Sequence, residues 1–143
     1  FQLLKECEGA ANIVISGHIR PDGDCVGSCM ATYLFLKKTM PKADIRIFLE
    51  QPETFFPVFR ILTDRYYFSD GSRACVFIAL DCEKTRLGEA EKIFDKAKKT
   101  INIDHHISNE HGCGDVNYID PKASSASELV YDVLDKQYLD EEI

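Results

Sequence analysis

The stretch from residue 12 to residue 24 reads NIVISGHIRPDGD, and it decides the fold of this chain. Its first five residues, Asn12 to Ser16, form an apolar run rich in β-branched side chains, which is typical of a buried strand. Pro21 and Gly23 then shape a short loop, and apolar residues recur at spacings of three and four from residue 26 to residue 38. The stretch therefore predicts a strand, a loop and a helix in immediate succession.

The remainder of the chain repeats this alternation. Apolar runs predict strands at 44–49, 75–80 and 100–103, and helical spacing predicts helices at 87–98 and 127–134. Such alternation favours an α/β fold, a three-layer Rossmann-like domain with a mostly parallel sheet and helices on both faces. The less regular segment 51–71 is expected to add a helical turn and an extra strand, with its aromatic residues in the core rather than on a base-stacking surface.

Length and composition limit the functions open to the chain. Its 143 residues are enough for one domain with one core. The 17 Lys and Arg against 24 Asp and Glu give a net charge of −7, which argues against broad contacts with long duplex nucleic acid. No apolar run approaches the ~20 residues of a membrane span, and the first residues lack a basic leader. We therefore expect a cytoplasmic protein without membrane contacts.

The six cysteines include no C-x-x-C pair, which argues against a disulfide scaffold. Cys25 and Cys29 lie four residues apart on an expected helix, a spacing that allows metal chelation. Free cysteines more often behave as small apolar side chains of the core. We interpret both residues as buried thiols.

Acidic and histidine side chains follow three of the predicted strands. In chain order they are His18, Asp22, Asp24, Asp81, Asp104, His105 and His106. Because ligands of parallel α/β sheets bind beyond the carboxyl ends of the strands, these side chains are expected to converge there. Helix capping is the alternative for Asp81 and for Asp24, which precedes the helix expected from near Cys25.

Such a set of side chains favours a metal centre. Mixed imidazole and carboxylate ligands suit manganese, iron, cobalt or zinc, and the lack of clustered thiolates argues against a structural zinc site. Several carboxylates can hold two ions ~3.5–4 Å apart, bridged by one Asp, so that an activated water attacks phosphorus in line. The pattern therefore predicts phosphoester hydrolysis.

These residues belong to motifs that resemble those of the DHH phosphoesterase superfamily over nearly the whole chain. The motifs are His18-x-x-Pro21-Asp22-Gly23-Asp24, Gly27-Ser28, Asp81, Asp104-His105-His106 with Asn109, and Ser124-Ser125-Ala126-Ser127-Glu128. Within the superfamily, the sequence is most similar to the oligoribonuclease (nanoRNase) and pAp-phosphatase subgroup and to the related cyclic-dinucleotide phosphodiesterases. Ser125 and Glu128 also match a helix capping box, the role that we favour for them.

The resemblance implies a centre of two Mn²⁺ ions, with Asp81 as the bridging ligand. Its metal ligands would be His18, Asp22 and Asp81 for one ion, and Asp24, Asp81 and His105 for the other. The catalytic residues would be Asp81, Asp104 and His106. His106 would face the substrate phosphate, and Asp104 would orient the histidines. Candidate substrate contacts are Arg20, Arg86 and Asn109. The alternative for the two arginines is a surface salt bridge, and the alternative for Asn109 is that it braces its loop. His111 is expected to be an exposed histidine rather than a ligand.

The family pattern also includes features that do not occur before Ile143. These are a further metal-ligand aspartate on a later strand and a C-terminal DHHA1 substrate-binding domain. We therefore interpret residues 1–143 as a truncated DHH catalytic domain, with weak or no activity as an isolated fragment. Without the further aspartate, the second ion would be incompletely coordinated.

The expected function is a metal-dependent hydrolase of short single-stranded oligoribonucleotides, as an exonuclease, or of small pAp-like nucleotides. Two alternatives remain open. One is a cyclic-di-AMP phosphodiesterase, and the other is a non-catalytic module that senses a metal or a nucleotide. A homodimer is also compatible with the sequence.

Overall fold

The computed structural model describes residues 2–49 and 75–139 of the chain. Within these ranges, a five-stranded sheet runs through the molecule in the order β2-β1-β3-β4-β5. Its strands are β1 (Asn12–Ser16), β2 (Asp44–Phe48), β3 (Val76–Leu80), β4 (Lys99–Asp104) and β5 (Val116–Ile119). Every neighbouring pair is parallel. The predicted α/β fold is confirmed, and the expected elements of segment 51–71 lie outside the described residues.

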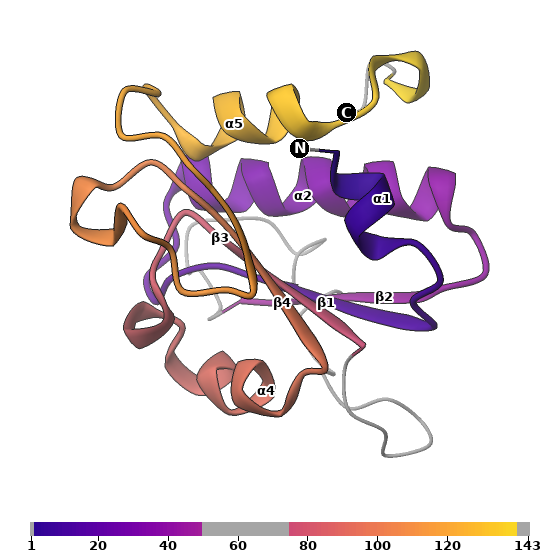
Figure 1. Cartoon of the computed structure of the whole chain (residues 1–143), viewed down its shortest axis with the longest axis horizontal. Helices are drawn as coiled ribbons and strands as arrows, with labels where there is room; N and C mark the ends of the chain where they lie inside the picture. Colours follow the sequence, from indigo (N-terminus) through magenta and orange to yellow (C-terminus); the bar gives the residue numbers. More distant parts are fainter. Residues whose placement is uncertain (1, 50–74, 140–143) are drawn as a thin grey trace.

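Helices cover both faces of this sheet (Figure 1). On one face lie α1 (Leu3–Cys7), α2 (Gly23–Thr39) and α5 (Ala126–Val133), whose apolar side chains form the larger core cluster with β-branched residues of the strands. On the other face, Phe94 of α4 (Glu91–Lys96) packs against Val14 and Phe77. The three-layer arrangement expected from the sequence is therefore present.

Side-chain caps define the two helices that border the site. The carboxylate of Asp22 accepts the backbone N–H of Cys25 at 2.9 Å and begins α2. The hydroxyl of Ser125 accepts the backbone N–H of Glu128 at 3.1 Å and begins α5, so the predicted capping function of Ser125 is confirmed. Asp24 does not cap α2, and this alternative for Asp24 was wrong because Asp22 is the residue with extended backbone before the first turn.

Several elements differ from the sequence-based expectation. The strand β5 and the short helix α1 were missed, and the helix predicted at 87–98 is shorter. Two 3₁₀ turns, η1 (Lys84–Arg86) and η2 (Gly88–Ala90), precede α4 in that region. In the part of the chain that the structure describes, no helix has both the length and the apolar character needed to cross a membrane.

Candidate metal centre

The strand order changes direction between β1 and β3, because β2 lies beyond β1 while β4 and β5 lie beyond β3. Such a switch point in a parallel sheet opens a crevice at the carboxyl ends of the strands, where ligands bind. His18 follows β1, Asp81 follows β3, and His105 follows β4 at this edge. The topology therefore brings together residues that are up to 87 positions apart in the sequence.

The centre of the group is Asp81, whose carboxylate lies between two imidazole rings. One oxygen, Oδ2, is 3.3 Å from Nε2 of His18, and the other, Oδ1, is 3.1 Å from Nε2 of His105. Asp81 is 3% exposed and has a positive φ of 63°. Because left-handed backbone is uncommon outside glycine and is concentrated at functional sites, the chain holds Asp81 in a costly conformation that aims it at both rings.

The ring of His18 is fixed from its other side. Its Nδ1 hydrogen bonds to the backbone carbonyl of Ile19 at 2.7 Å, which directs Nε2 toward Asp81. The hydrogen bond to Asp81 raises the pKa of His18 to about 9, although burial acts in the opposite direction. Nε2 is also 3.8 Å from Oδ1 of Asp22, whose side chain is largely exposed.

Asp24 lies on the His105 side of the centre. Its Oδ2 is 3.7 Å from Nε2 of His105. The same carboxylate accepts hydrogen bonds from the backbone N–H groups of Ala126 and Ser127, both at 2.9 Å, and from the Ser127 hydroxyl at 2.8 Å. Burial raises the pKa of Asp24, but these hydrogen bonds outweigh it and lower the pKa below its ordinary value.

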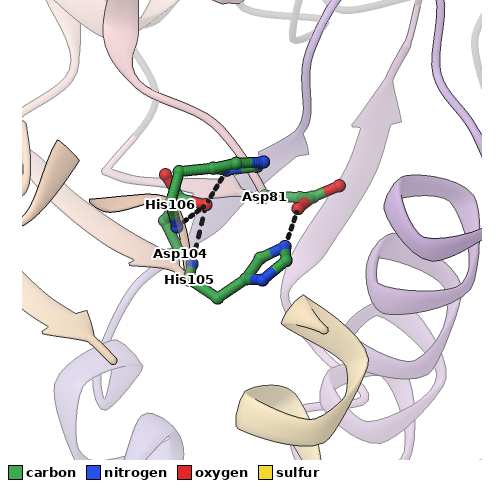
Figure 2. Close-up of side chains that lie close together, drawn as sticks. All are labelled: Asp81, Asp104, His105 and His106. Atoms are coloured by element: carbon green, nitrogen blue, oxygen red, sulfur yellow. Dashed lines mark hydrogen bonds and ion pairs between the residues drawn. The ribbon is translucent and has the colours of Figure 1, made fainter. Parts of the chain in front are cut away.

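Asp104 and His106 form a second arrangement beside Asp81 and His105, as Figure 2 shows. Asp104 is fully buried, and its Oδ1 lies 2.6 Å from Nδ1 of His106. The same oxygen accepts the backbone N–H of His105 at 2.8 Å. Since Nδ1 is bonded to Asp104, Nε2 is the nitrogen with which His106 can meet a ligand, and the orienting role expected for Asp104 fits this geometry.

Two asparagines hold the loop behind Asp104. The Asn109 side-chain amide donates to Oδ2 of Asp104 and to Oδ1 of Asn102, both at 2.9 Å. The Asn102 amide in turn donates to the carbonyl oxygens of Ala79 and Cys82. Asn109 is 7% exposed, and its side chain is used in these hydrogen bonds. This geometry favours the loop-bracing role over the substrate contact. Asn102 was missed, although an asparagine within an apolar strand was a detectable signal.

The arginines expected to meet phosphate lie in adjoining loops. The backbone N–H of Ile19, beside Arg20, donates to the carbonyl oxygen of Arg86 at 2.8 Å, which joins the loop after β1 to the turn after β3. Both arginine side chains are exposed. His111, by contrast, has a side chain that is 92% exposed and is paired with Glu110, so its predicted exposure is confirmed.

Cys25 and Cys29 are fully buried, as predicted, but Cys25 is also part of the site. A ligand atom of His18, the sulfur of Cys25 and a carboxylate oxygen of Asp81 all lie within 4.8 Å of one another. A hydrogen bond from the Cys29 thiol lowers the pKa of Cys25, against the effect of burial. Cys25 was predicted to be a core residue, and its proximity to His18 and Asp81 was not predicted.

The donor set fits divalent metal ions. Asp81, Asp104, His105 and His106 also place one ligand atom each within 4.8 Å of one another. Nitrogen and oxygen donors in such proximity suit Mn²⁺, Fe²⁺, Co²⁺ or Zn²⁺. The backbone bond of His18 supplies the outer hydrogen bond that orients a ligand imidazole.

The fold and the site together define a class: doubly wound α/β proteins with a cluster of carboxylates and imidazoles at the switch point of the sheet. The sequence comparison gives the family within that class. Residues 12–143 match the model described as "DHH family, N-terminal domain", and the chain belongs to this family. The resemblance inferred from the sequence motifs is therefore confirmed.

The chain is similar in sequence to several curated proteins. The chain is 26% identical over 132 residues to a probable bifunctional oligoribonuclease and PAP phosphatase NrnA of Streptococcus mutans, covering 91% of this chain and 40% of the relative. It is 31% identical over 140 residues to the bifunctional oligoribonuclease and PAP phosphatase NrnA of Thermus thermophilus, covering 94% and 39%. Similarity extends to the cyclic-di-AMP phosphodiesterase PdeA of Listeria monocytogenes, at 22% identity over 87% of this chain and 21% of the relative.

Solved structures agree with this fold. An exopolyphosphatase-related protein from Bacteroides fragilis matches with a TM-score of 0.71 and 30% identity, over 92% of this chain and 41% of that protein. An exonuclease RecJ bound to manganese matches with a TM-score of 0.54 and 14% identity, over 90% of this chain and 34% of that protein, and shows the shared fold alone. The chain thus spans less than half the length of these relatives and structures.

Proposed function

We propose that residues 1–143 are the catalytic domain of a phosphoesterase that hydrolyses short oligoribonucleotides or small pAp-like nucleotides. The observation that carries the proposal is the position of Asp81, with one carboxylate oxygen facing His18 and the other facing His105. A carboxylate shared in this way is suited to bridge two divalent ions. The similarity to the NrnA oligoribonucleases and PAP phosphatases supports the substrate class.

In this proposal, the two halves of the centre have separate ligands. His18, Asp22 and Asp81 would hold one ion, and Asp24, Asp81 and His105 would hold the other, with Mn²⁺ or another divalent metal in each position. Divalent ions held there would supply Lewis-acid stabilisation of the phosphate charge and a water nucleophile of lowered pKa. The short distances from His18 and His105 to Asp81 support this division. A further ligand and a DHHA1 substrate-binding domain, in the protein beyond residue 143, would complete the centre and the cleft.

The remaining polar residues act on the substrate or position the groups that do. His106 presents Nε2 to a phosphate oxygen, because Asp104 occupies its Nδ1. Asp104 is a positioning residue for His106, held in turn by Asn109. Arg20 and Arg86 are exposed at the same edge of the sheet and would contact the anionic substrate.

Cyclic di-AMP is the second candidate substrate, because the chain is also similar to the phosphodiesterase PdeA. All of these substrates require attack of water on phosphorus at the same proposed ligands, in a phosphodiester of RNA or cyclic di-AMP or in a phosphomonoester of pAp. They differ in how the bases are held, which the described residues do not determine. The distinction therefore requires a direct comparison of substrates.

The test is an assay of the metal-free full-length protein with Mn²⁺ titrated against three substrates: pAp, a di- or trinucleotide RNA, and cyclic di-AMP. We expect Mn²⁺-dependent release of phosphate from pAp and of mononucleotides from RNA, both faster than cleavage of cyclic di-AMP. Preferential cleavage of cyclic di-AMP would support the second candidate. Tight metal or nucleotide binding with no hydrolysis of any of the three would instead indicate a sensor and contradict the proposal.

A further inference from the structure

The sulfur of Cys25 lies beside two proposed metal ligands, His18 and Asp81. One ligand atom of each residue lies within 4.8 Å of the other two, and all three residues are buried. Typical zinc distances are ~2.3 Å to sulfur and ~2.0–2.1 Å to a histidine nitrogen. At the tetrahedral angle of such sites, two ligands of one ion are separated by roughly 3.5 Å. The widest separation among the three atoms must therefore shorten by at most about 1.3 Å to place all three around one ion.

The surrounding backbone is shaped to admit this sulfur. A Cβ atom built on Gly17 would lie 2.2 Å from Sγ of Cys25, so the close approach requires glycine at position 17. Cys25 is the third residue of α2, whose first turn favours a negatively charged group. This position suits a thiolate as well as a buried thiol.

Both partners of Cys25 are oriented as ligands. His18 uses Nδ1 on the Ile19 carbonyl, which leaves Nε2 directed at Asp81. The carboxylate of Asp81 lies between Nε2 of His18 and Nε2 of His105, at 3.3 and 3.1 Å. The sulfur therefore faces two side chains with restricted freedom, which lowers the cost of closing them around an ion.

We propose that Cys25 is a further ligand of the ion held by His18 and Asp81, and that its sulfur makes this half of the centre selective for thiophilic ions. The proposal rests on the metal centre of the proposed function. The other half of the proposed centre, formed by Asp24, Asp81 and His105, offers imidazole and carboxylate donors alone. The two halves would therefore differ: sulfur favours Co²⁺, Zn²⁺ or Fe²⁺ at His18, whereas oxygen and nitrogen donors suit Mn²⁺ at His105.

The experiment is a Co²⁺ titration of the metal-free, reduced full-length protein, followed by absorption spectroscopy. Thiolate coordination produces a sulfur-to-cobalt charge-transfer band in the near ultraviolet, separate from the visible bands that report any bound Co²⁺. We expect the charge-transfer band in the wild type and in Cys29→Ala, the matched control one helical turn away. In Cys25→Ser the band should disappear while the visible bands remain.

Competition between ions gives a second measurement. Loss of an outer hydrogen-bonding partner costs ~10–100-fold in metal affinity, and loss of a direct ligand is expected to cost at least as much. The Co²⁺ affinity of Cys25→Ser should therefore fall at least about tenfold relative to its Mn²⁺ affinity. Circular dichroism and thermal unfolding establish that the variants are folded, and X-ray absorption at the cobalt edge of the wild type detects a sulfur ligand independently of any variant.

The outcomes separate this proposal from the one on which it rests. Co²⁺ binding by the wild type with no charge-transfer band and no sulfur at the cobalt edge overturns the role of Cys25 and leaves the metal centre intact. Loss of the band in Cys29→Ala, with retention in Cys25→Ser, assigns the sulfur to Cys29 and also overturns it. Absence of any Co²⁺ or Mn²⁺ binding overturns both proposals.

Discussion

The carboxylate of Asp24, near the start of α2, accepts the backbone N–H of Ser127, 103 residues later in the chain, at 2.9 Å. It also accepts the neighbouring N–H of Ala126, so the side chain of one helix caps the first turn of another. These donors are otherwise unsatisfied at a helix start, and a negative charge there is favoured. Asp24 thus joins the metal centre to the packing of α5 on α2.

Replacement of Asp24 by Ala is expected to destabilise the metal-free protein. Hydrogen bonds to charged groups contribute about 1.5–3 kcal/mol each. Ser127 is exposed and its donors can bond to water instead, whereas Ala126 is buried, so we expect a loss of about 1–3 kcal/mol in total. Asp24→Asn, which keeps one acceptor oxygen, should lie between Ala and the wild type. Urea unfolding of the chelator-treated protein measures the difference. Asp132→Ala removes an exposed carboxylate from α5 and serves as the control. Equal stability of all four proteins would contradict the capping role.

Asp81→Asn should abolish turnover without unfolding the protein. Asn has the same shape and tolerates the left-handed backbone at this position, where φ is 63°. It lacks the charge needed to bridge two cations. Loss of a residue that only hydrogen bonds to a metal ligand costs up to about 100-fold, so we expect loss of a bridging ligand to lower turnover by at least about 100-fold. Turnover under saturating Mn²⁺ is the measurement. Asp95→Asn, an exposed site on α4, is the matched control, and near-normal turnover in Asp81→Asn would exclude the bridging role.

The raised pKa of His18 predicts a pH dependence of stability. The imidazole has a pKa of about 9 in the folded protein, against an ordinary value of 6.5. Its contribution is therefore complete below pH 6.5 and is lost as the pH rises toward about 9. The groups that face the ring are Asp81, Asp22 and Cys25. In the metal-free protein, we expect the free energy of unfolding to decline across this window more steeply in the wild type than in His18→Gln.

Saturating Mn²⁺ should cancel that decline. Only the neutral imidazole binds a metal ion, so the stabilisation by Mn²⁺ should increase as the pH rises through the same window. Thermal unfolding at fixed Mn²⁺, from pH 6 to pH 9, measures the difference between the loaded and the metal-free protein. Parallel curves for the two forms would show that His18 does not exchange a proton for the ion.

Sequence periodicity was sufficient to predict the central strands, because continuous apolar runs such as 12–16 and 76–80 have few alternatives in a chain of this length. It missed β5, whose four residues are only partly buried and pair with β4 through tertiary contacts. It also missed α1, which is too short for a periodic pattern to be distinguished. The predicted helix 87–98 began too early because two 3₁₀ turns precede α4.

The convergence of His18, Asp81 and His105 could be predicted because each follows a strand, and parallel strands end at one edge. Contacts between distant helices gave no local signal, as the bond from Asp24 to α5 illustrates. The proximity of Cys25 to His18 likewise depends on how α2 packs against β1. Periodicity identifies Cys25 as buried, but it does not say which polar side chains the sulfur faces.

Asp104 and His106 should act as one unit in catalysis. The 2.6 Å contact at Nδ1 fixes the ring, so Asp104→Asn leaves His106 free to rotate or to change tautomer. We expect a loss of about 10–100-fold in turnover, typical of an outer partner of a site histidine. His106→Ala should cost at least as much, and the double variant should be no slower than His106→Ala alone, since Asp104 acts through the ring. Turnover of the four proteins at saturating substrate and Mn²⁺ completes the cycle. Additive losses would show that Asp104 contributes independently of His106. Nuclear magnetic resonance of the imidazole nitrogens would then show whether the His106 tautomer changes in Asp104→Asn.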